Sequence, residues 1–263
     1  MDLGIKGRTA LVFGGSRGLG FASAQALGRE GAKIVIVSRH SDSLGDAERR
    51  LKAAGAQDVR GLALDLADVA AVSQWLVLQQ DLLGCVDILI NNTGGPTPTA
   101  AQATTLDQWR QGFDTLFLST TRISQAVLPG MKSRRWGRIL TITSTAVVEP
   151  IDHLAVSTTM RAAVSTFSKL LATEVARDGI TVNTVMPGVI HTDRITNLRR
   201  AKAEREGTTL EVEMTKTANS IPVGRMGRPE ELGDLVAFLA SEKAGFLTGC
   251  AVPLDGGARR SWT

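Results

Sequence analysis

Residues 10–20 read ALVFGGSRGLG, a short apolar run followed by glycines in the spacing GxxxGxG. The apolar run predicts a buried strand, and Gly14, Gly18 and Gly20 predict a tight turn into a helix. Such a turn lets the backbone approach a pyrophosphate closely, and the free N–H groups at the start of the helix favour its negative charge. Taken alone, a glycine-rich turn of this kind is a weak signal for a dinucleotide site, so the rest of the chain decides its meaning.

Beyond this turn, short runs rich in β-branched residues alternate with longer amphipathic segments. We expect strands at 9–13, 33–38, 59–64, 86–91, 138–143, 181–186 and 251–254, and helices at 18–30, 43–54, 69–83, 106–132, 154–178 and 230–241. The alternation predicts βαβ crossovers, which build a buried parallel sheet with helices on both faces. The expected fold class is therefore α/β, as a single doubly wound domain of the Rossmann type over residues 1–263.

One stretch, residues 192–228, interrupts this alternation. It is polar, follows a late strand and ends close to Pro222 and Pro229. A long insertion at this place in a sheet protein is usually a lid or a substrate-binding flap. We expect residues 192–228 to form a substrate lid.

The composition limits the partners and the compartment. The apolar fraction is 43%, the charged fraction is 21% and the net charge is +4 with the charges scattered, so no nucleic-acid partner is expected. Only two cysteines occur and their spacing suggests neither a metal site nor a redox pair. No apolar run is long enough to span a membrane, and MDLGIKGRTALVF leads almost directly into the first strand without a separate signal core. We expect a cytoplasmic protein with no metal and no membrane partner.

The end of the second predicted strand bears on the choice of nucleotide. The segment reads IVIVSRH, with Ser38 and Arg39 where an acid would bind the ribose 2′-hydroxyl of NAD. Arg17 lies inside the glycine loop. Two guanidinium groups able to reach the adenosine ribose favour a 2′-phosphate through charge-assisted hydrogen bonds, although two solvated arginines are the alternative. The sequence thus favours NADP(H) over NAD(H).

Further motifs follow in order along the chain: ALDLAD at 63–68, NNTGG at 91–95, GRILTITS at 137–144, PGVIHT at 187–192, IPVGRMGRPEE at 221–231 and FLTGCAVPLDGG at 246–257. Together they resemble the short-chain dehydrogenase/reductase family over nearly the full chain, and look closest to its 3-oxoacyl-acyl-carrier-protein reductase-like branch. The resemblance implies a single domain with a seven-stranded parallel sheet and a small-molecule or acyl-thioester carbonyl substrate. It also implies a homo-oligomer, most often a tetramer. The long helices predicted at 106–132 and 154–178 point the same way, because they carry apolar residues on more than one side.

The resemblance also implies which residues contact the cofactor. Asp65 would lie near the adenine, Asn91 and Gly94 beside the cofactor, and residues 187–192 around the nicotinamide, with Thr192 near the carboxamide. The expected cofactor-binding set is Gly14, Ser16, Arg17, Gly18, Leu19, Gly20, Ser38, Arg39, Asp65, Leu66, Asn91, Thr93, Gly94, Arg161, Pro187, Gly188, Ile190 and Thr192.

The resemblance fails at the reaction centre, because the chain contains no tyrosine. The family uses Asn, Ser, Tyr and Lys there, with Tyr and Lys spaced YxxxK. Ser144 matches the serine, but Ser157 stands at the tyrosine position, Arg161 at the lysine position and Leu116 at the asparagine position. Similar proteins with Ser and Arg at these two positions form a recognisable atypical set. Ser144, Ser157 and Arg161 are the expected catalytic residues.

These replacements change the available chemistry. Reduction of a ketone needs a hydride and a proton for the developing alkoxide, and a tyrosine with a pKa of about 10, lowered by a nearby lysine, suits the proton role. A serine hydroxyl is a far weaker acid, and an arginine keeps its proton at ordinary pH. Ser144 and Ser157 remain as oxyanion donors. His153, four residues before Ser157, and His191 are the alternative proton sources.

More than one function remains open from the sequence. The leading hypothesis is an NADP(H)-dependent oxidoreductase that acts on a carbonyl or alcohol with an atypical active site. The second is a non-catalytic homologue that keeps the fold and the nucleotide and serves as a binding or scaffold subunit. A third is a reaction such as dehydration or isomerisation, in which no hydride leaves the cofactor.

Overall fold

The computed structural model of the protein describes residues 1–261 and contains a seven-stranded sheet in which all paired strands are parallel. The strand order is β3-β2-β1-β4-β5-β6-β7. The strands are β1 (Thr9–Phe13), β2 (Lys33–Ser38), β3 (Val59–Ala63), β4 (Ile88–Asn91), β5 (Gly137–Ile142), β6 (Ile180–Pro187) and β7 (Ala251–Leu254). The expected fold class, a single doubly wound α/β domain with a seven-stranded parallel sheet, is confirmed.

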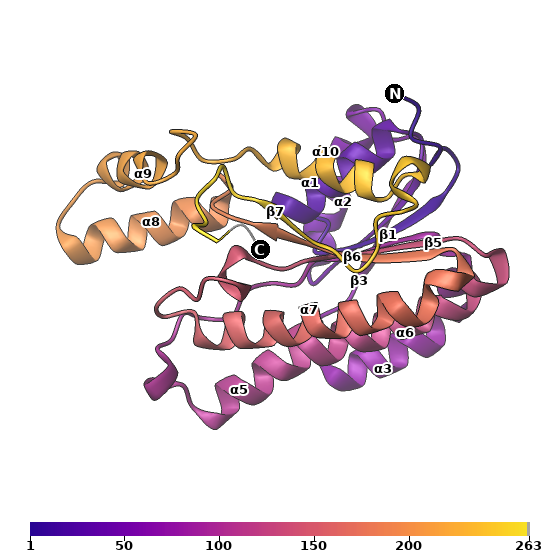
Figure 1. The fold of residues 1–263 in the computed structure, drawn as a ribbon, viewed down its shortest axis with the longest axis horizontal. Helices are drawn as coiled ribbons and strands as arrows, with labels where there is room; N and C mark the ends of the chain where they lie inside the picture. Colours follow the sequence, from indigo (N-terminus) through magenta and orange to yellow (C-terminus); the bar gives the residue numbers. More distant parts are fainter. Residues whose placement is uncertain (262–263) are drawn as a thin grey trace.

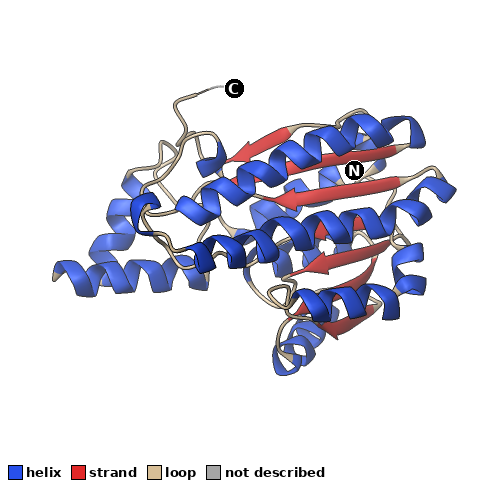
Figure 2. Ribbon diagram, turned by 90° about the horizontal axis from the view of Figure 1, so that it is seen from below, coloured by secondary structure: helices blue, strands red, loops and turns tan. Residues whose placement is uncertain are grey.

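Helices cover both faces of this sheet, as Figures 1 and 2 show. One layer contains α1 (Gly18–Arg29), α2 (Ser41–Ala53) and α10 (Pro229–Leu239). The other layer contains α3 (Val69–Leu78), α4 (Gln80–Cys85), α5 (Leu106–Gly112), α6 (Ser119–Arg134) and α7 (Ala155–Val175). The arrows in Figure 2 point toward the end of the molecule from which α8 (Asp193–Glu206) and α9 (Leu210–Asn219) extend, so these two helices lie at the carboxyl end of the sheet.

The first strand shows why the sheet is apolar on both faces. Ala10 and Val12 pack into the core beneath α1 and α10, whereas Leu11 and Phe13 pack into the core beneath α3, α6 and α7. The ring of Phe13 meets Trp75 of α3 edge to face, with 5.8 Å between the ring centroids. A central parallel strand is mostly apolar along its length because helices cover both of its sides.

Two expected helices differ from the observed ones. The segment 69–83 divides at Gln79, whose ψ angle of 19° interrupts the helix between α3 and α4. The segment 106–132 is continuous but contains a π-helical turn, Phe113–Leu118, between α5 and α6. The boundaries of β3, β4, β5 and β6 differ from the expected ones by one or two residues, which is the usual uncertainty of an element end.

The polar segment 192–228 holds the helices α8 and α9, which a buried ion cluster joins. The carboxylate of Glu213 is buried and accepts from Lys202 and from Lys216, each at 2.8 Å. These hydrogen bonds lower the pKa of Glu213 to about 2. The segment is therefore a compact helical pair rather than an irregular loop, and Figure 1 shows it beyond the end of the sheet.

Candidate active site

The glycine loop lies where the strand order of the sheet changes direction. β1 pairs with β2 on one side and with β4 on the other. The connections that leave β1 and β4 therefore diverge, and they open a crevice at the carboxyl ends of these strands. Doubly wound folds bind their ligands in this crevice.

The glycines of the loop stand at positions that a side chain would not tolerate. Gly14 and Gly18 have φ angles of 61° and 57°, in the left-handed region that favours glycine. A Cβ at Gly14 would lie 2.5 Å from the amide nitrogen of Asn92, and a Cβ at Gly20 would overlap the carbonyl of Gly14. The backbone of the loop is thus packed closely against the start of α1 and the end of β4.

The start of α1 leaves room for an anion. Arg17 stands at its N-cap without a side-chain capping hydrogen bond, and the first turn contains no acidic residue. A Cβ built on Gly18 would meet only the methyl group of Thr192, at 3.8 Å. Leu19, next to Gly18, packs against the core and fixes the helix start. A gap bordered by uncapped N–H groups and Thr192 fits a pyrophosphate.

A cavity of about 330 Å³ opens beside the ends of β2 and β3. Arg39 and Asp65 line it together with apolar side chains that include Leu64 and Trp75. Leu66, the neighbour of Asp65, is partly buried against the core. An apolar wall beside an exposed guanidinium fits an adenosine whose ribose carries a 2′-phosphate.

Two serines connect the glycine loop to the end of β2. The hydroxyls of Ser16 and Ser38 lie 2.9 Å apart and hydrogen bond to each other. The side chains of Arg17 and Arg39 are exposed, and neither forms a salt bridge within residues 1–261. Both guanidinium groups are therefore available to a ligand.

Arg161, in the second turn of α7, connects three elements at the expected reaction centre. Its Nη1 donates to the carbonyl of Ile142 at 2.8 Å, its Nη2 to the carbonyl of Thr93 at 3.3 Å, and its Nε to the hydroxyl of Ser157 at 3.3 Å. Burial, and then the positive charge of Arg194, lower the pKa of Arg161 to about 10. The guanidinium therefore stays charged at neutral pH and ties the ends of β4 and β5 to α7.

The two expected catalytic serines are half-buried, and the hydroxyl of each can donate a hydrogen bond. Ser144 follows β5, and its hydroxyl accepts from the backbone N–H of Ala146 at 3.1 Å. The turn that begins there packs against α7, whose first turn carries Ser157. Each hydroxyl already accepts one hydrogen bond and can donate to a substrate oxygen. Leu116 lies in the π-helical turn and is only 2% exposed, so it adds an apolar group and no relay.

The end of β4 contributes backbone rather than the side chain of Asn91. The amide nitrogen of Asn91 donates to the hydroxyls of Ser124 and Thr141, at 3.0 Å and 3.4 Å, and the residue is 2% exposed. Gly94 is exposed, and the carbonyl of Thr93 accepts from the reaction-centre arginine. Asn91 therefore supports the loop from within the core.

Residues 187–192 run from the end of β6 to the start of α8. Pro187 is buried, and the N–H of Gly188 donates to the carbonyl of Leu254 at 2.9 Å. Ile190 is 4% exposed, which anchors the segment in the core. Thr192 is the N-cap of α8 and faces the glycine loop. The expected cofactor segment is thus one wall of the crevice.

Arg194 also belongs to this region, although the sequence analysis did not single it out. Its guanidinium lies against Gly95, so closely that a Cβ on Gly95 would overlap it. Much of the Arg194 side chain is exposed to solvent, but the partial burial of its guanidinium lowers its pKa. The only available signal was its position two residues after the PGVIHT motif, and nothing in that spacing shows which way the side chain turns.

His153 does not share a helix face with Ser157. α7 begins at Ala155, and His153 precedes it with a φ of 63°. The condition that His153 and Ser157 share a helix face is therefore not met. His191 is exposed, and its backbone N–H donates to the carbonyl of Gly227 at 2.8 Å.

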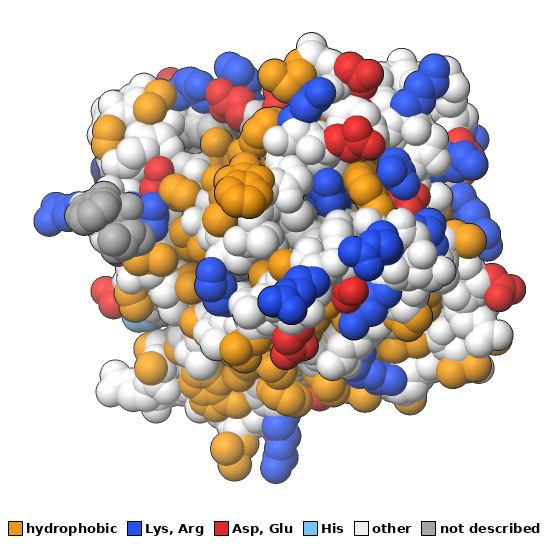
Figure 3. Space-filling view, turned by 45° about the vertical axis from the view of Figure 1, so that its right-hand side comes forward, with side chains coloured by type: hydrophobic (Ala, Val, Ile, Leu, Met, Phe, Trp, Pro, Cys, Tyr) orange, Lys and Arg blue, Asp and Glu red, His pale blue; other side chains and the backbone are white. Residues whose placement is uncertain are grey.

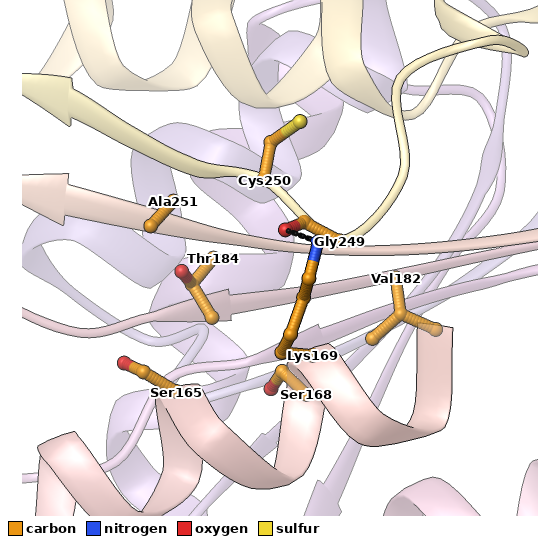
Figure 4. A pocket seen from close by; sticks show the side chains of 8 residues that line it. All are labelled: Ser165, Ser168, Lys169, Val182, Thr184, Gly249, Cys250 and Ala251. Atoms are coloured by element: carbon orange, nitrogen blue, oxygen red, sulfur yellow. Dashed lines mark hydrogen bonds between the residues drawn. The ribbon is translucent and has the colours of Figure 1, made fainter. Parts of the chain in front are cut away.

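A second cavity, of about 180 Å³, lies between α7, β6 and β7 (Figure 4). Lys169 extends from α7 toward β7, and its Nζ donates to the carbonyl of Gly249 at 3.1 Å. Its lining contains none of the glycine-loop residues. Within residues 1–261 no cluster of His, Cys, Asp and Glu could hold a metal ion. No helix in the described part of the chain is long and apolar enough to cross a bilayer.

Comparisons with known proteins agree with this architecture. Residues 14–259 match the family described as enoyl-(acyl carrier protein) reductase. The chain is 35% identical over 257 residues to the 3-oxoacyl-[acyl-carrier-protein] reductase FabG of Pseudomonas aeruginosa. The alignment covers 97% of this chain and 98% of that protein.

Solved structures give the same result. L-sorbose reductase from Gluconobacter frateurii, complexed with NADPH and L-sorbose, is 32% identical with a TM-score of 0.94, over 99% of this chain and 100% of that one. A 3-oxoacyl (acyl-carrier-protein) reductase from Agrobacterium tumefaciens C58 with NADP bound is 31% identical with a TM-score of 0.88, over 97% and 96% of the two chains. Because sequence and fold agree over almost the whole length, the chain belongs to the short-chain dehydrogenase/reductase family.

Proposed function

We propose that the protein is an NADP(H)-dependent oxidoreductase that acts on a carbonyl or alcohol substrate, in the manner of the 3-oxoacyl reductases. The observation that carries this proposal is the uncapped start of α1 at the β1–β4 junction, with Arg17 at its N-cap and Arg39 in the cavity beside the ends of β2 and β3. Neither arginine forms a salt bridge within residues 1–261. The similarity to reductases solved with NADPH or NADP supports the same cofactor here. A screen of carbonyls with NADPH, and of alcohols with NADP, tests the activity.

Each part of the crevice would hold a different part of the cofactor. The gap between Gly18 and Thr192 suits the pyrophosphate, and Arg39 with Arg17 suits the 2′-phosphate. Arg161 has N–H groups beyond those it donates to the protein, and these suit ribose hydroxyls. When bound, the nicotinamide supplies or accepts the hydride.

The proposed active site is atypical in its proton chemistry. Ser144 and Ser157 orient the substrate oxygen by hydrogen bonds, and Arg161 adds a positive charge that favours a developing alkoxide. Neither a serine hydroxyl nor a guanidinium releases a proton readily near neutral pH. Buried Leu116 removes the polar group that would hold a relay water. Turnover should therefore be slow unless the substrate or solvent supplies the proton.

The missing acid also favours a second candidate function. A homologue that binds the nucleotide without turning over a substrate needs the glycine loop, Arg39 and Asp65, but it needs no proton donor. Activity in the carbonyl and alcohol screen separates this binding or scaffold role from the enzyme. The cytoplasmic location expected from the sequence stays a prediction.

The protein should bind NADPH more tightly than NADH. Arg39 lines the cavity at the end of β2, where an acid would repel a 2′-phosphate. A charge-assisted hydrogen bond contributes about 1.5–3 kcal/mol, so Arg39→Ala should weaken NADPH binding by about tenfold or more and leave NADH binding unchanged. Calorimetry measures both affinities. Arg60→Ala, which removes an exposed charge on β3 outside the cavity, is the matched control. Equal affinities of the native protein for the two cofactors would contradict the prediction.

Restoring the family's residues should restore proton transfer. The triple variant Ser157→Tyr, Arg161→Lys, Leu116→Asn should reduce an activated ketone faster than the native protein, because a positioned general acid contributes about 10²–10⁴-fold. NADPH affinity should change little. The control carries phenylalanine instead of tyrosine (Ser157→Phe) in the same background, which keeps the ring and removes the hydroxyl. Steady-state kinetics compare all three proteins after circular dichroism has shown that each is folded.

Fast native turnover that the triple variant abolishes would contradict this account. Ser144, Ser157 and Arg161 would then serve another mechanism. His153→Ala and His191→Ala would be the next variants to measure.

We further propose that residues 192–228 close over the bound cofactor as a lid. The segment begins at Thr192, which faces the glycine loop, and Glu213 holds α8 and α9 together as one unit. Amide hydrogen exchange in α8 and α9 should slow when NADPH is added. Glu213→Gln should speed exchange in both helices at neutral pH, where the native carboxylate is charged. Exchange that saturating NADPH leaves unchanged would remove the lid.

We also propose a homotetramer. Leu106, Phe113 and Leu170 are 72%, 43% and 61% exposed on the layer of α5 and α7, and Phe246 is fully exposed just before the edge strand β7. Figure 3 shows hydrophobic side chains gathered along the lower edge of one face, with a further group nearer its centre. Two separate apolar surfaces suit a closed assembly with more than one kind of contact. Light scattering should give about four times the chain mass of 27.9 kDa. A particle of one chain mass would contradict it.

A further inference from the structure

Two arginines from distant parts of the chain meet on the short loop after β4. Nη2 of Arg161, on α7, donates to the carbonyl of Thr93 at 3.3 Å. The guanidinium of Arg194, on α8, lies against Gly95. The two groups are close enough for the charge of Arg194 to lower the pKa of Arg161. The loop at 93–95 therefore has one guanidinium at each end.

Neither guanidinium has an acidic partner in the part of the chain that the structure describes. Arg161 donates three hydrogen bonds, all to uncharged oxygens, and Arg194 donates none within residues 1–261. No carboxylate contributes to the pKa of either group. Two like charges are thus held together without neutralisation, which costs free energy in the absence of a ligand.

Several other cations of the protein form ion pairs with carboxylates. Arg134 pairs with Asp87 at 3.0 Å, and Arg225 pairs with Glu231 at 2.7 Å. The lysines around buried Glu213 are paired as well. Unlike these cations, Arg161 and Arg194 have no carboxylate partner within residues 1–261, and they lie beside the crevice that a ligand would enter.

We propose that Arg161 and Arg194 form an anion site that takes a carboxylate of the substrate, so that the substrate is an oxo acid or hydroxy acid. The proposal deepens the proposed function and rests on it. A guanidinium presents parallel N–H groups that match a carboxylate, and Arg194 donates none of its N–H groups to the protein within residues 1–261. Arg161, whose remaining N–H groups suit the ribose hydroxyls, adds its positive charge at the other end of the loop. Its hydrogen bond to Ser157 puts the anion beside the serine hydroxyls that would hold the reacting oxygen.

Two guanidinium groups could also bind a phosphate of the cofactor instead of a substrate carboxylate. The position of Arg161 and Arg194 argues against a cofactor phosphate. The proposed binding site of the pyrophosphate is a separate one, at the uncapped start of α1 beside Gly18. Arg161 stands instead on α7, next to Ser157. The two sources predict different effects of the same variant, so they can be separated by experiment.

The experiment compares binding of acetoacetate with binding of its methyl ester, which has the same carbonyl and no charge. Calorimetry measures both ligands with the native protein, alone and saturated with NADP⁺. We expect acetoacetate to bind at least about tenfold more tightly than methyl acetoacetate, as one charge-assisted hydrogen bond would give. Arg194→Gln should remove this difference, and Arg194→Lys should keep part of it.

The control is Arg200→Gln, which removes the same charge from the same helix. Arg200 is exposed, and its one hydrogen bond within residues 1–261 is to Asn197, at 2.9 Å. This variant should keep the preference for acetoacetate, which excludes a general effect of net charge. NADPH affinity of Arg194→Gln should stay within about twofold of the native value.

Three results would overturn the proposal: equal affinities for acid and ester, no binding of acetoacetate, or a preference that Arg194→Gln leaves intact. If Arg194→Gln weakens NADPH binding and leaves the ratio of acid to ester unchanged, the anion is a cofactor phosphate. The measurement needs no turnover. A protein that discriminates acid from ester but reduces no carbonyl would therefore overturn the proposed function and keep the anion site.

Discussion

The backbone contact between Gly14 and Gly20 sets the position of the elements around the site. Gly20 has no Cβ, and this allows α1 to begin directly over the end of β1. A Cβ at this position would overlap the carbonyl of Gly14. The side chain of Asn92 uses the same carbonyl, donating to it at 3.4 Å, so the end of β4 is held against the turn. Any side chain in this contact would lift α1 from the sheet, and overpacking of this kind costs about 1–3 kcal/mol.

Most of the fold could be predicted from the sequence because the central strands are buried on both faces. The strands β1, β2 and β4 are mostly apolar runs (ALVF, IVIV and ILI), and β1, β2 and β7 have the predicted limits. The break at Gln79 could not be predicted, because the apolar period continues across it. The π-helical turn Phe113–Leu118 was equally hidden, since one wide turn shifts the period by less than the scatter of the pattern.

The site was predictable where short sequence motifs define it and hidden where tertiary contacts do. The glycine loop is local in sequence, so its place at the start of α1 could be inferred. The hydrogen bond of Arg161 to Thr93 spans 68 residues, and the contact of Arg194 with Gly95 depends on how α8 leaves β6. His153 failed as a partner of Ser157 because it adopts a left-handed backbone, which is uncommon outside glycine.

The packing of α10 on α1 has a consequence for the order in which the protein can fold. A Cβ on Gly233 of α10 would lie 2.5 Å from the carbonyl of Ala22, so the two helices touch backbone to backbone. Leu232 and Val236 of α10 belong to the same core as Phe21 of α1. The helix that follows the glycine loop is therefore fully packed only when α10, which lies late in the chain, is in place. During synthesis, its apolar face stays uncovered until α10 has emerged, and an incomplete chain would expose that face to chaperones and to aggregation.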